Sequence, residues 1–460
     1  MELKNSPAYK PERFKKFEPI WQLIDTVWDS LAFPDDMRRY LKKKPEESQK
    51  DYNARLEFST LENRYRPTIT SNAAPLSAYE FTEDVPESIR RFESDIDGDG
   101  TNLATFLFNL AEMLMKYDSI FILAESQQSI PNQEIRTEQD LRISGKRPVL
   151  KLVGIKGLQN GRVNENQDFQ QLVFCHNTLE PDGDYGETEQ KQYWRYQPGS
   201  LTKYIIDDKS KEAKKIGEAV NYVDARQNPF TEIPMVWVSG SKRPKLDLGV
   251  PYFLTLAKLN VQHLIKTSEL DDIEFKCNNP TPKRKWPNRK PDNPPKLILG
   301  KVIECEMGGD VEFLEPTGAA IASTHGRNLD RETKMDRIGQ AFLSGGENSR
   351  TATEARIDMA QSVASLKGFA EVIESAIQEA FRLWTLYSGE ATSGGIQINK
   401  DVLAMPADPA MVRTIIDGMV QQGYSRRYAL LKLQEIGFQP KEIDIDDELN
   451  QSLILNEALN

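Results

Sequence analysis

The chain has 460 residues, 38% of them hydrophobic and 9% aromatic, which is enough apolar material for about three domains with packed cores. Its formal net charge of -11 excludes a globally basic nucleic-acid-binding protein, so any contact with a polyanion has to come from local clusters. No run approaches the roughly 18 apolar residues of a membrane span, and the polar start favours a soluble protein made in the cytoplasm.

Cysteine and histidine are scarce and scattered. Cys175 and His176 are adjacent, but neighbouring residues of a strand point to opposite faces, so they do not share a metal. Reduced thiols and no metal cofactor are the expectation. The six residues are Cys175, Cys277, Cys305, His176, His263 and His325.

The N-terminal region is predicted to be helical. Apolar residues at helical spacing predict a helix from about Ile20 to Leu31, which Pro34 ends. A more charged pattern predicts a second helix from about Glu46 to Phe58. Residues 59–88, which are rich in proline, permit no firm assignment.

The turn at residues 95–100 reads Asp-Ile-Asp-Gly-Asp-Gly, which matches the first half of a calcium-binding loop. Asp95, Asp97 and Asp99 stand where such a loop has ligands, but Phe106 occupies the position of the bidentate glutamate. An acid-rich turn that caps the apolar helix Leu103–Met115 is the simpler interpretation. The three aspartates are therefore only a weak candidate for a metal site.

From Ser119 onward the pattern changes to short β-rich runs separated by turn-forming stretches, which predicts a mostly antiparallel sheet. The runs are 120–123, 149–153, 172–174, 193–196, 204–206 and 235–238.

A helix from Tyr252 to about Phe275 leads into an unusual segment, Lys276–Lys296. This segment has seven basic residues, one acidic residue and six prolines, so it cannot be a helix. Its local charge favours contact with nucleic acid or an acidic partner surface, with Trp286 as a stacking or anchoring residue. A solvated basic loop is the alternative.

Short strands at 296–299, 302–306 and 311–314 and a helix from about Ala319 to Phe342 follow. The loop Leu343–Ala352 contains two glycines and several hydroxyl side chains that suit a helix start. A long helix of roughly 35 residues comes next. Its apolar residues recur at spacings of four and three and predict one buried face: Met359, Val363, Leu366, Ala370, Ile373, Ile377, Ala380 and Trp384.

The tail is predicted to contain a strand at 396–398 and a small separate helical domain at about 405–460. Its helices are expected at 409–421, 425–436 and 448–459, with Ser425 as an N-cap and Gly423 and Gly437 at helix ends.

Three stretches in this order of elements resemble the portal proteins of tailed bacteriophages. They read Val-Glu-Phe-Leu-Glu-Pro at 311–316, Met-Asp-Arg-Ile-Gly at 335–339 and Arg-Thr-Ala-Thr-Glu-Ala at 350–355. The chain is most similar to a portal family long known only as a domain of unknown function. The resemblance extends from about Asp51 to Gly437, and residues 350–355 are its most telling part.

The resemblance implies an α+β portal-like subunit with named parts. They are a wing at 1–248, a stem helix at 249–275, a clip at 276–316, a second stem helix at 317–343, a tunnel loop at 344–352, a long wing helix with a return strand at 353–404, and a helical crown at 405–460.

The same resemblance implies a ring of about twelve copies at one capsid vertex, a channel for packaging and ejecting double-stranded DNA. Its partners would be terminase, head-completion or adaptor proteins, and major capsid and scaffolding proteins, with no membrane. It would be located in the virion, and in the host cytoplasm during assembly. No catalytic residue and no cofactor are implied, because the ATPase belongs to the terminase.

Two residue sets follow from this mapping. The loop that narrows the channel would be Ser344, Gly345, Gly346, Glu347, Asn348, Ser349, Arg350 and Thr351. The clip that docks partners would use Lys276, Lys283, Arg284, Lys285, Trp286, Arg289, Lys290 and Lys296. For Arg350, an ordinary salt bridge to Glu354 one turn later is an equal alternative.

Two other functions stay open at this point. The chain could be another virion connector or minor head protein that docks on a portal. A metal-dependent enzyme acting on nucleic acid through Asp95, Asp97 and Asp99 is the weakest hypothesis, since the sequence has no phosphate-binding glycine loop and no nucleophile with its base.

Overall fold

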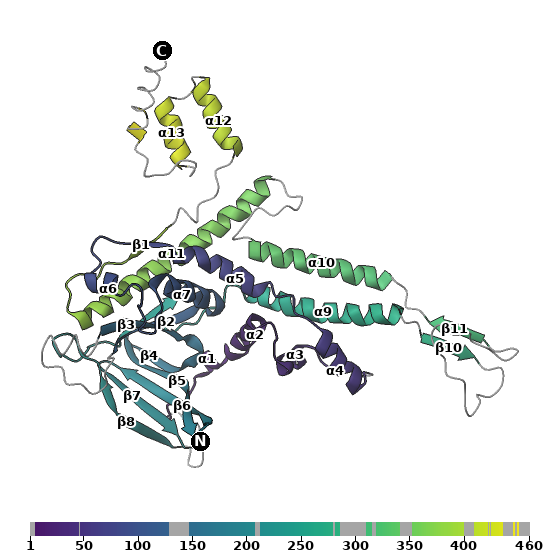
Figure 1. Ribbon diagram of the computed structural model, residues 1–460, viewed down its shortest axis with the longest axis horizontal. Coiled ribbons are helices and arrows are strands. Elements are labelled where there is room, and N and C mark those ends of the chain that lie inside the picture. Colours follow the sequence, from purple (N-terminus) through teal and green to yellow (C-terminus); the bar gives the residue numbers. More distant parts are fainter. Residues whose placement is uncertain are drawn as a thin grey trace. The chain divides into compact units, whose positions relative to one another are not determined.

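The structure is a computed structural model, and its fold combines helices with sheets, which confirms the α+β class (Figure 1). It divides into two compact units. Unit 1 comprises Met1–Trp21, Thr68–Phe253 and Gln340–Asn460, and unit 2 comprises Gln22–Pro67 and Leu254–Gly339. The residues described are 5–45, 47–127, 147–207, 212–278, 281–285, 310–314, 319–340, 352–399, 409–421, 423, 425–435, 445–446 and 449.

Unit 1 contains antiparallel sheets, as predicted. A three-stranded sheet has the order β3-β2-β9, a five-stranded sheet has the order β4-β5-β6-β7-β8, and β1 pairs with β12. The strands are β1 (Tyr79–Phe81), β2 (Ser119–Gln127), β3 (Arg147–Gly154), β4 (Leu158–Val163), β5 (Phe169–Asp182), β6 (Gly186–Gln197), β7 (Ser200–Ile206), β8 (Ala213–Asn221), β9 (Met235–Ser239) and β12 (Ile396–Ile398). In the described part of the chain, all pairings of these strands are antiparallel.

Unit 1 also contains helices, two of which belong to the tail. They are α1 (Glu12–Lys15), η1 (Ala74–Ser77), α6 (Glu87–Arg91), α7 (Leu103–Tyr117), η2 (Ile155–Gly157), α11 (Ala352–Ser388), α12 (Pro409–Val420) and α13 (Arg426–Glu435). Two boundaries between the units fall within helices, namely α2 (Glu18–Trp28) and α5 (Tyr65–Ala73). None of the helices in the described ranges is long and apolar enough to cross a membrane.

Helix α11 packs against β2, β3 and β9, and it also contacts α7. Its predicted buried stripe is confirmed for the part whose side chains are described, because each of these residues is at most 3% exposed: Leu366, Ala370, Ile373, Ile377, Ala380 and Trp384. The side chains of Met359 and Val363 lie outside the described part. One face of this helix therefore forms the centre of the unit 1 core.

Two expectations for the N-terminal region were wrong in detail. Pro34 was predicted only to end the preceding helix. It is also the first residue of a further helix, α3 (Pro34–Tyr40), where its missing N–H is tolerated. Helix α4 (Gln49–Phe58) begins three residues after the predicted Glu46, since the Ser48 hydroxyl accepts a hydrogen bond from the Asp51 N–H at 3.1 Å.

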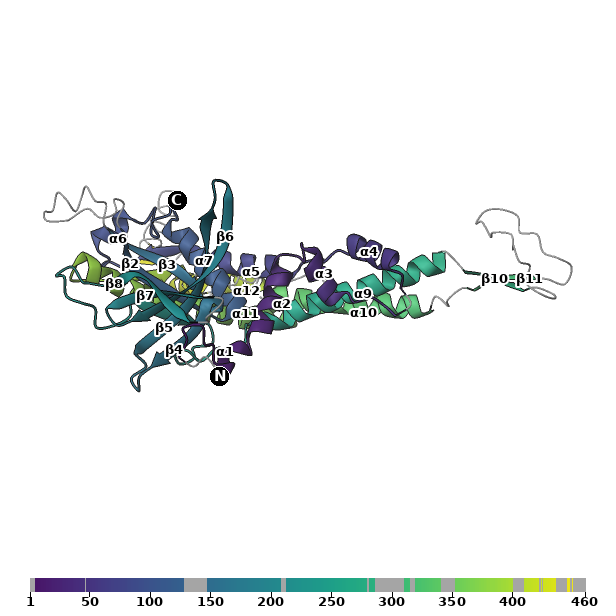
Figure 2. The same ribbon diagram turned by 90° about the horizontal axis from the view of Figure 1, so that it is seen from below.

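Unit 2 is built on two long helices, α9 (Leu254–Asn278) and α10 (Ala319–Gln340), close to the predicted bounds. Both views show them side by side (Figures 1 and 2). Between them in the chain lie β10 (Thr281–Lys285) and β11 (Asp310–Leu314), an antiparallel pair. β11 agrees with the predicted strand at 311–314, whereas β10 was not expected. A two-stranded ribbon tolerates Pro282 because the ribbon has free edges. The strands predicted at 296–299 and 302–306 lie outside the described residues.

The tail forms the first two of its predicted helices. α12 and α13 share a small core of Val412, Ile415, Ala429 and Leu433. Ser425 is the N-cap as predicted, since its hydroxyl accepts a hydrogen bond from the Tyr428 N–H at 3.2 Å. The helix expected at 448–459 and the glycine end at Gly437 lie outside the described part. The finer division of the chain into wing, stem, clip, tunnel loop and crown stays a prediction.

Candidate functional site

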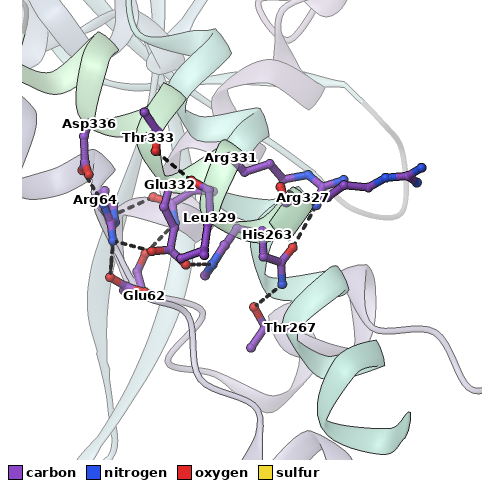
Figure 3. A network of polar contacts seen from close by, with 12 residues as sticks. Glu62, Arg64, His263, Thr267, Arg327, Leu329, Arg331, Glu332, Thr333 and Asp336 are labelled. Atoms are coloured by element: carbon purple, nitrogen blue, oxygen red, sulfur yellow. Dashed lines mark hydrogen bonds and ion pairs between the residues drawn. The ribbon is translucent and has the colours of Figure 1, made fainter. Parts of the chain in front are cut away.

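The two long helices of unit 2 are antiparallel, and polar side chains join them (Figure 3). The His263 Nε2 atom of α9 lies 3.0 Å from Oε1 of Glu332 on α10. One turn along, the side-chain amide of Asn328 donates to the Thr267 hydroxyl at 3.4 Å. Because the numbering rises along one helix as it falls along the other, the two helices run in opposite directions.

Arg64 connects the segment before α5 to α10 (Figure 3). Its guanidinium donates to Glu62 Oε1 at 2.7 Å, to Glu332 Oε2 at 3.4 Å and to the Asp336 carboxylate. Burial lowers the pKa of Arg64, but the hydrogen bonds to Asp336 and Glu62 outweigh it and hold that pKa above its usual value. The guanidinium therefore stays charged and fastens three carboxylates at once.

Asn260 fixes the same segment onto α9. This residue is fully buried, and its Oδ1 atom accepts hydrogen bonds from the backbone N–H groups of Arg64 at 2.9 Å and Tyr65 at 3.1 Å. Its amide group donates to the Glu62 carbonyl at 2.6 Å. Its amide oxygen and its amide nitrogen thus both have hydrogen-bond partners in residues 62–65, as a buried amide requires.

Glu62, His263 and Glu332 are a possible metal-ligand set, since one ligand atom from each lies within 4.8 Å of the others. Imidazole and carboxylate are suitable ligands for zinc. However, the Arg64 guanidinium already donates to both glutamates, and a dication placed among them would repel it. We therefore interpret the cluster as a structural contact that joins α9, α10 and the segment before α5. The sequence did not reveal it, because its members lie far apart in the chain and no local motif marks them.

The basic segment is partly organised by β10. Lys283, Arg284 and Lys285 stand on this strand, and the register places Lys283 opposite Glu312 and Lys285 opposite Asp310. Acidic residues thus reduce the net charge of the ribbon relative to β10 alone. Lys276 belongs to the last turn of α9, which ends at Asn278, so the prediction of a non-helical segment was wrong for its first three residues. Trp286, Arg289, Lys290 and Lys296 lie outside the described residues, so their predicted role stays a prediction.

The predicted tunnel loop is also outside the described part. The structure describes α10 up to Gln340 and α11 from Ala352. The predicted loop residues that lie between these helices are Ser344, Gly345, Gly346, Glu347, Asn348, Ser349, Arg350 and Thr351.

In the acid-rich turn of unit 1, two aspartates hold the turn's own backbone. Asp95 Oδ1 accepts hydrogen bonds from the N–H groups of Gly98 at 3.0 Å and Gly100 at 2.8 Å. Asp97 Oδ1 accepts from the N–H groups of Asp99 at 2.9 Å and Thr101 at 3.1 Å. Burial raises the pKa of Asp97, but its hydrogen bonds, first that of the Thr101 side chain, outweigh this and lower that pKa.

The remaining contacts of this turn are with cations of β3. The Arg147 guanidinium donates to Asp95 Oδ2 at 2.5 Å and to the Asp95 carbonyl at 2.7 Å. Lys151 Nζ lies 3.8 Å from Asp99 Oδ2. The cap of α7 is Asn102, whose Oδ1 accepts from the Thr105 N–H at 2.8 Å, and not one of the acids as predicted. The carboxylates thus have structural partners within the unit.

The comparisons with known proteins give one family and several structures. A family described as Domain of unknown function (DUF4055) matches residues 252–388. No curated protein matches the chain.

Three of the similar solved structures are chains of gene transfer agent (GTA) particles. One, from the virion of a native particle, is 8% identical with a TM-score of 0.39 and covers 78% of this chain and 85% of that chain. A second, from the neck of an empty particle computed with C6 symmetry, is 9% identical with a TM-score of 0.40, and the coverages are 82% and 90%. A third, from the neck of a native particle computed with C12 symmetry, is 9% identical with a TM-score of 0.41, and the coverages are 94% and 96%.

Proposed function

We propose that this chain is the subunit of a portal ring, which occupies one vertex of a phage-like capsid and conducts double-stranded DNA during packaging and ejection. The observation that carries the proposal is the organisation of unit 2. A long helix, α9, leads to a ribbon with a basic strand, and an antiparallel helix, α10, returns. The resemblance to portal sequences supports it, since residues 311–314 of its first stretch fall on β11 and its stretch at 335–339 falls on α10.

In this proposal each part has a physical task. The antiparallel helices are the stem, and the contacts among Arg64, His263 and Glu332 hold it as a stiff rod. The β10–β11 ribbon is the clip that meets the terminase and, later, head-completion proteins. Residues 344–351 form the narrowest point of the channel. A ring multiplies each charge by the number of copies, so the net charge of -11 would repel DNA overall while a few cations centre it.

The role is structural, without a catalytic residue or a cofactor. Crown and wing would contact capsid and scaffolding proteins in the virion, and the ring would assemble in the host cytoplasm. The packaging motor supplies the ATPase activity.

Native mass spectrometry and negative-stain microscopy of the purified protein test the proposal. We expect rings of about twelve copies with a central channel. A protein that stays monomeric under conditions that favour assembly contradicts it. A connector or minor head protein that binds a separate portal without making a ring of its own is then the better explanation. Nuclease or ATPase activity abolished by Asp97→Ala would instead favour an enzyme.

A further inference from the structure

The hairpin formed by β5 and β6 extends beyond its own sheet. These strands pair from Leu172 and Tyr196 out to Asp182 and Gly186. The neighbouring strand β4 pairs with β5 only as far as Phe174, and β7 pairs with β6 only as far as Gln192. Residues 177–191, which we name the arm, are therefore a ribbon of two strands with both edges unpaired in the described structure.

The arm is acidic and carries exposed apolar side chains. Tyr185 at its tip is fully exposed, and Leu179 is 65% exposed. The arm carries five carboxylates, and within the described part of the chain none of them forms an ion pair: Glu180, Asp182, Asp184, Glu187 and Glu189.

This composition is unfavourable for a ribbon that stays in water. An isolated hairpin of two strands is marginally stable at best, and exposed strand edges invite pairing with another chain. Close carboxylates on the same ribbon also repel one another. A partner with positive charge and a place for an aromatic side chain would relieve the carboxylate repulsion and stabilise the hairpin through new contacts.

Unit 1 itself has such a surface next to α1. A hollow of about 140 Å³ lies between the helix and the segment 245–248. That is below the roughly 300–1,000 Å³ of a pocket for a small molecule, and it suits a single inserted side chain. Its lining residues are Arg13, Lys16, Phe17, Lys245, Leu246, Asp247 and Leu248.

The cations of this hollow have aromatic but no described acidic partners. Arg13 lies 4.7 Å from the Phe14 ring centroid, Lys16 lies 5.2 Å from that of Phe17, and Lys245 lies 4.8 Å from that of Phe169. None of the three cations forms an ion pair with a carboxylate in the described ranges. Arg13 also donates a hydrogen bond to the Gly161 carbonyl at 3.1 Å, and its guanidinium, like the two lysine ammonium groups, has further N–H groups for a carboxylate of another molecule.

The arm and the hollow lie on opposite sides of unit 1. Figure 2 shows the ribbon labelled β6 extending to one side and α1 on the other. Two different, complementary patches on opposite sides of a subunit produce a head-to-tail contact, and a ring results where the rotation closes.

We infer that the acidic arm of one copy binds the basic hollow beside α1 of the next copy. Tyr185 enters the hollow among Arg13, Lys16 and Lys245, where its ring meets cations and its hydroxyl stays at the polar rim. The arm carboxylates pair with these cations, which favours the contact and fixes its direction. The inference rests on the proposed ring and names the surfaces that close it.

A charge-exchange experiment tests the contact. One variant reverses the arm (E180K/D182K/E187K), a second reverses the hollow (R13E/K16E/K245E), and a third combines both sets. We expect each single set to raise the protein concentration needed for ring assembly by about tenfold or more, because like charges then face each other. The combined variant should recover rings, as measured by native mass spectrometry. E165K/E218K is the matched control, since both glutamates are exposed in the same five-stranded sheet region.

The possible outcomes distinguish a failure of the proposed arm–hollow contact from a failure of the proposed ring. If the wild-type protein makes rings and the arm variant makes them equally well, the contact is refuted and the ring stands. Rings that persist while binding to another virion protein is lost assign the arm to that protein and also refute the contact. A wild-type protein that never makes rings refutes the proposed function together with the contact.

A cross-link gives a second readout that does not depend on weakened assembly. A variant with both D184C and K16C should form disulfides between copies and give a ladder of covalent oligomers without reductant. Each single cysteine variant controls for the native thiols. Rings of the double variant that yield no more cross-link than the single variants overturn the proposed contact.

Discussion

His263 of α9 and Glu332 of α10 face each other across the helix pair, with Nε2 and Oε1 3.0 Å apart. The histidine is buried, whereas the glutamate side chain is 27% exposed and also receives a hydrogen bond from Arg64. One carboxylate therefore joins α9, α10 and the segment before α5.

Removal of both partners should reveal a direct coupling between the helices. In a double-mutant cycle of His263→Ala and Glu332→Ala, we expect a coupling free energy of about 0.5–3 kcal/mol in urea unfolding. The exposed pair Lys266 and Glu269, 2.6 Å apart within α9, is the control and should give about 0.2–0.5 kcal/mol. Equal coupling in the two cycles would contradict a fastening role for His263.

Acid should weaken unit 2 through Glu47. Two hydrogen bonds from the Arg55 guanidinium, at 2.7 and 2.8 Å, are the main cause that lowers the pKa of Glu47 to about 2. Because the folded pKa is below the usual 4.5, this stability is present above pH 4.5 and is lost as the pH falls toward 2.

Glu47→Gln should accordingly cost about 1–3 kcal/mol of unfolding free energy at pH 7 and progressively less below pH 4.5. Urea titrations at several pH values measure the difference. Glu57→Gln, an exposed position on α4, is the matched control and should change little at any pH. A cost for Glu47→Gln that does not depend on pH would disprove the assignment.

Asp118 should affect the pH dependence of stability in the opposite direction to Glu47. Burial raises the pKa of its carboxyl, and hydrogen bonds from Ser241, Ser119 and Ser239 offset this only in part. With a folded pKa above the unfolded one, its contribution is most favourable below the unfolded pKa and declines as the pH rises through the folded pKa.

Asp118→Asn removes the buried charge, keeps an oxygen acceptor and suits the positive φ of 65° at this helix end. We expect unfolding free energy at pH 7 to stay equal or rise by up to about 1 kcal/mol, with a weaker pH dependence above pH 4. Asp118→Ala should instead cost about 1–3 kcal/mol, because the serine hydroxyls lose their acceptor. Thermal unfolding across pH measures both, and an unchanged pH profile for Asp118→Asn would count against this explanation.

The lysines of strand β10 should contribute to binding of the packaging motor and not to folding. Lys283→Glu with Lys285→Glu should leave rings intact and lower the affinity for the packaging motor about tenfold or more, since like charges would face its acidic surface. Surface plasmon resonance between ring and motor measures this. The control, Lys50→Glu with Lys215→Glu, reverses two exposed lysines elsewhere. Loss of folding, or equal binding by both variants, would oppose the docking role.

Several features were predictable from local sequence because their cause is local. The apolar spacing of α11 predicted its buried face, since a helix repeats every 3.6 residues wherever it lies. Ser425 was predictable as a cap because its partner, the Tyr428 N–H, is three residues away. The alternation of β-rich runs and turns likewise predicted antiparallel strands.

Other features depend on residues that are distant in the chain. Strand β1 has three residues and is defined by pairing with β12, so residues 59–88 gave no local signal for it. The aspartates of the turn at 95–100 look like metal ligands in sequence, and only the fold brings Arg147 to Asp95.

The sequence by itself determined the long helices, several strands of the sheets and the places where charge accumulates, because these properties follow from spacing along one element. Only the tertiary structure decided that Arg64 meets Asp336, that β10 is a strand, and that the arm leaves its sheet. Such contacts join residues whose approach is governed by packing and loop closure, and the pattern around either residue alone does not contain that information.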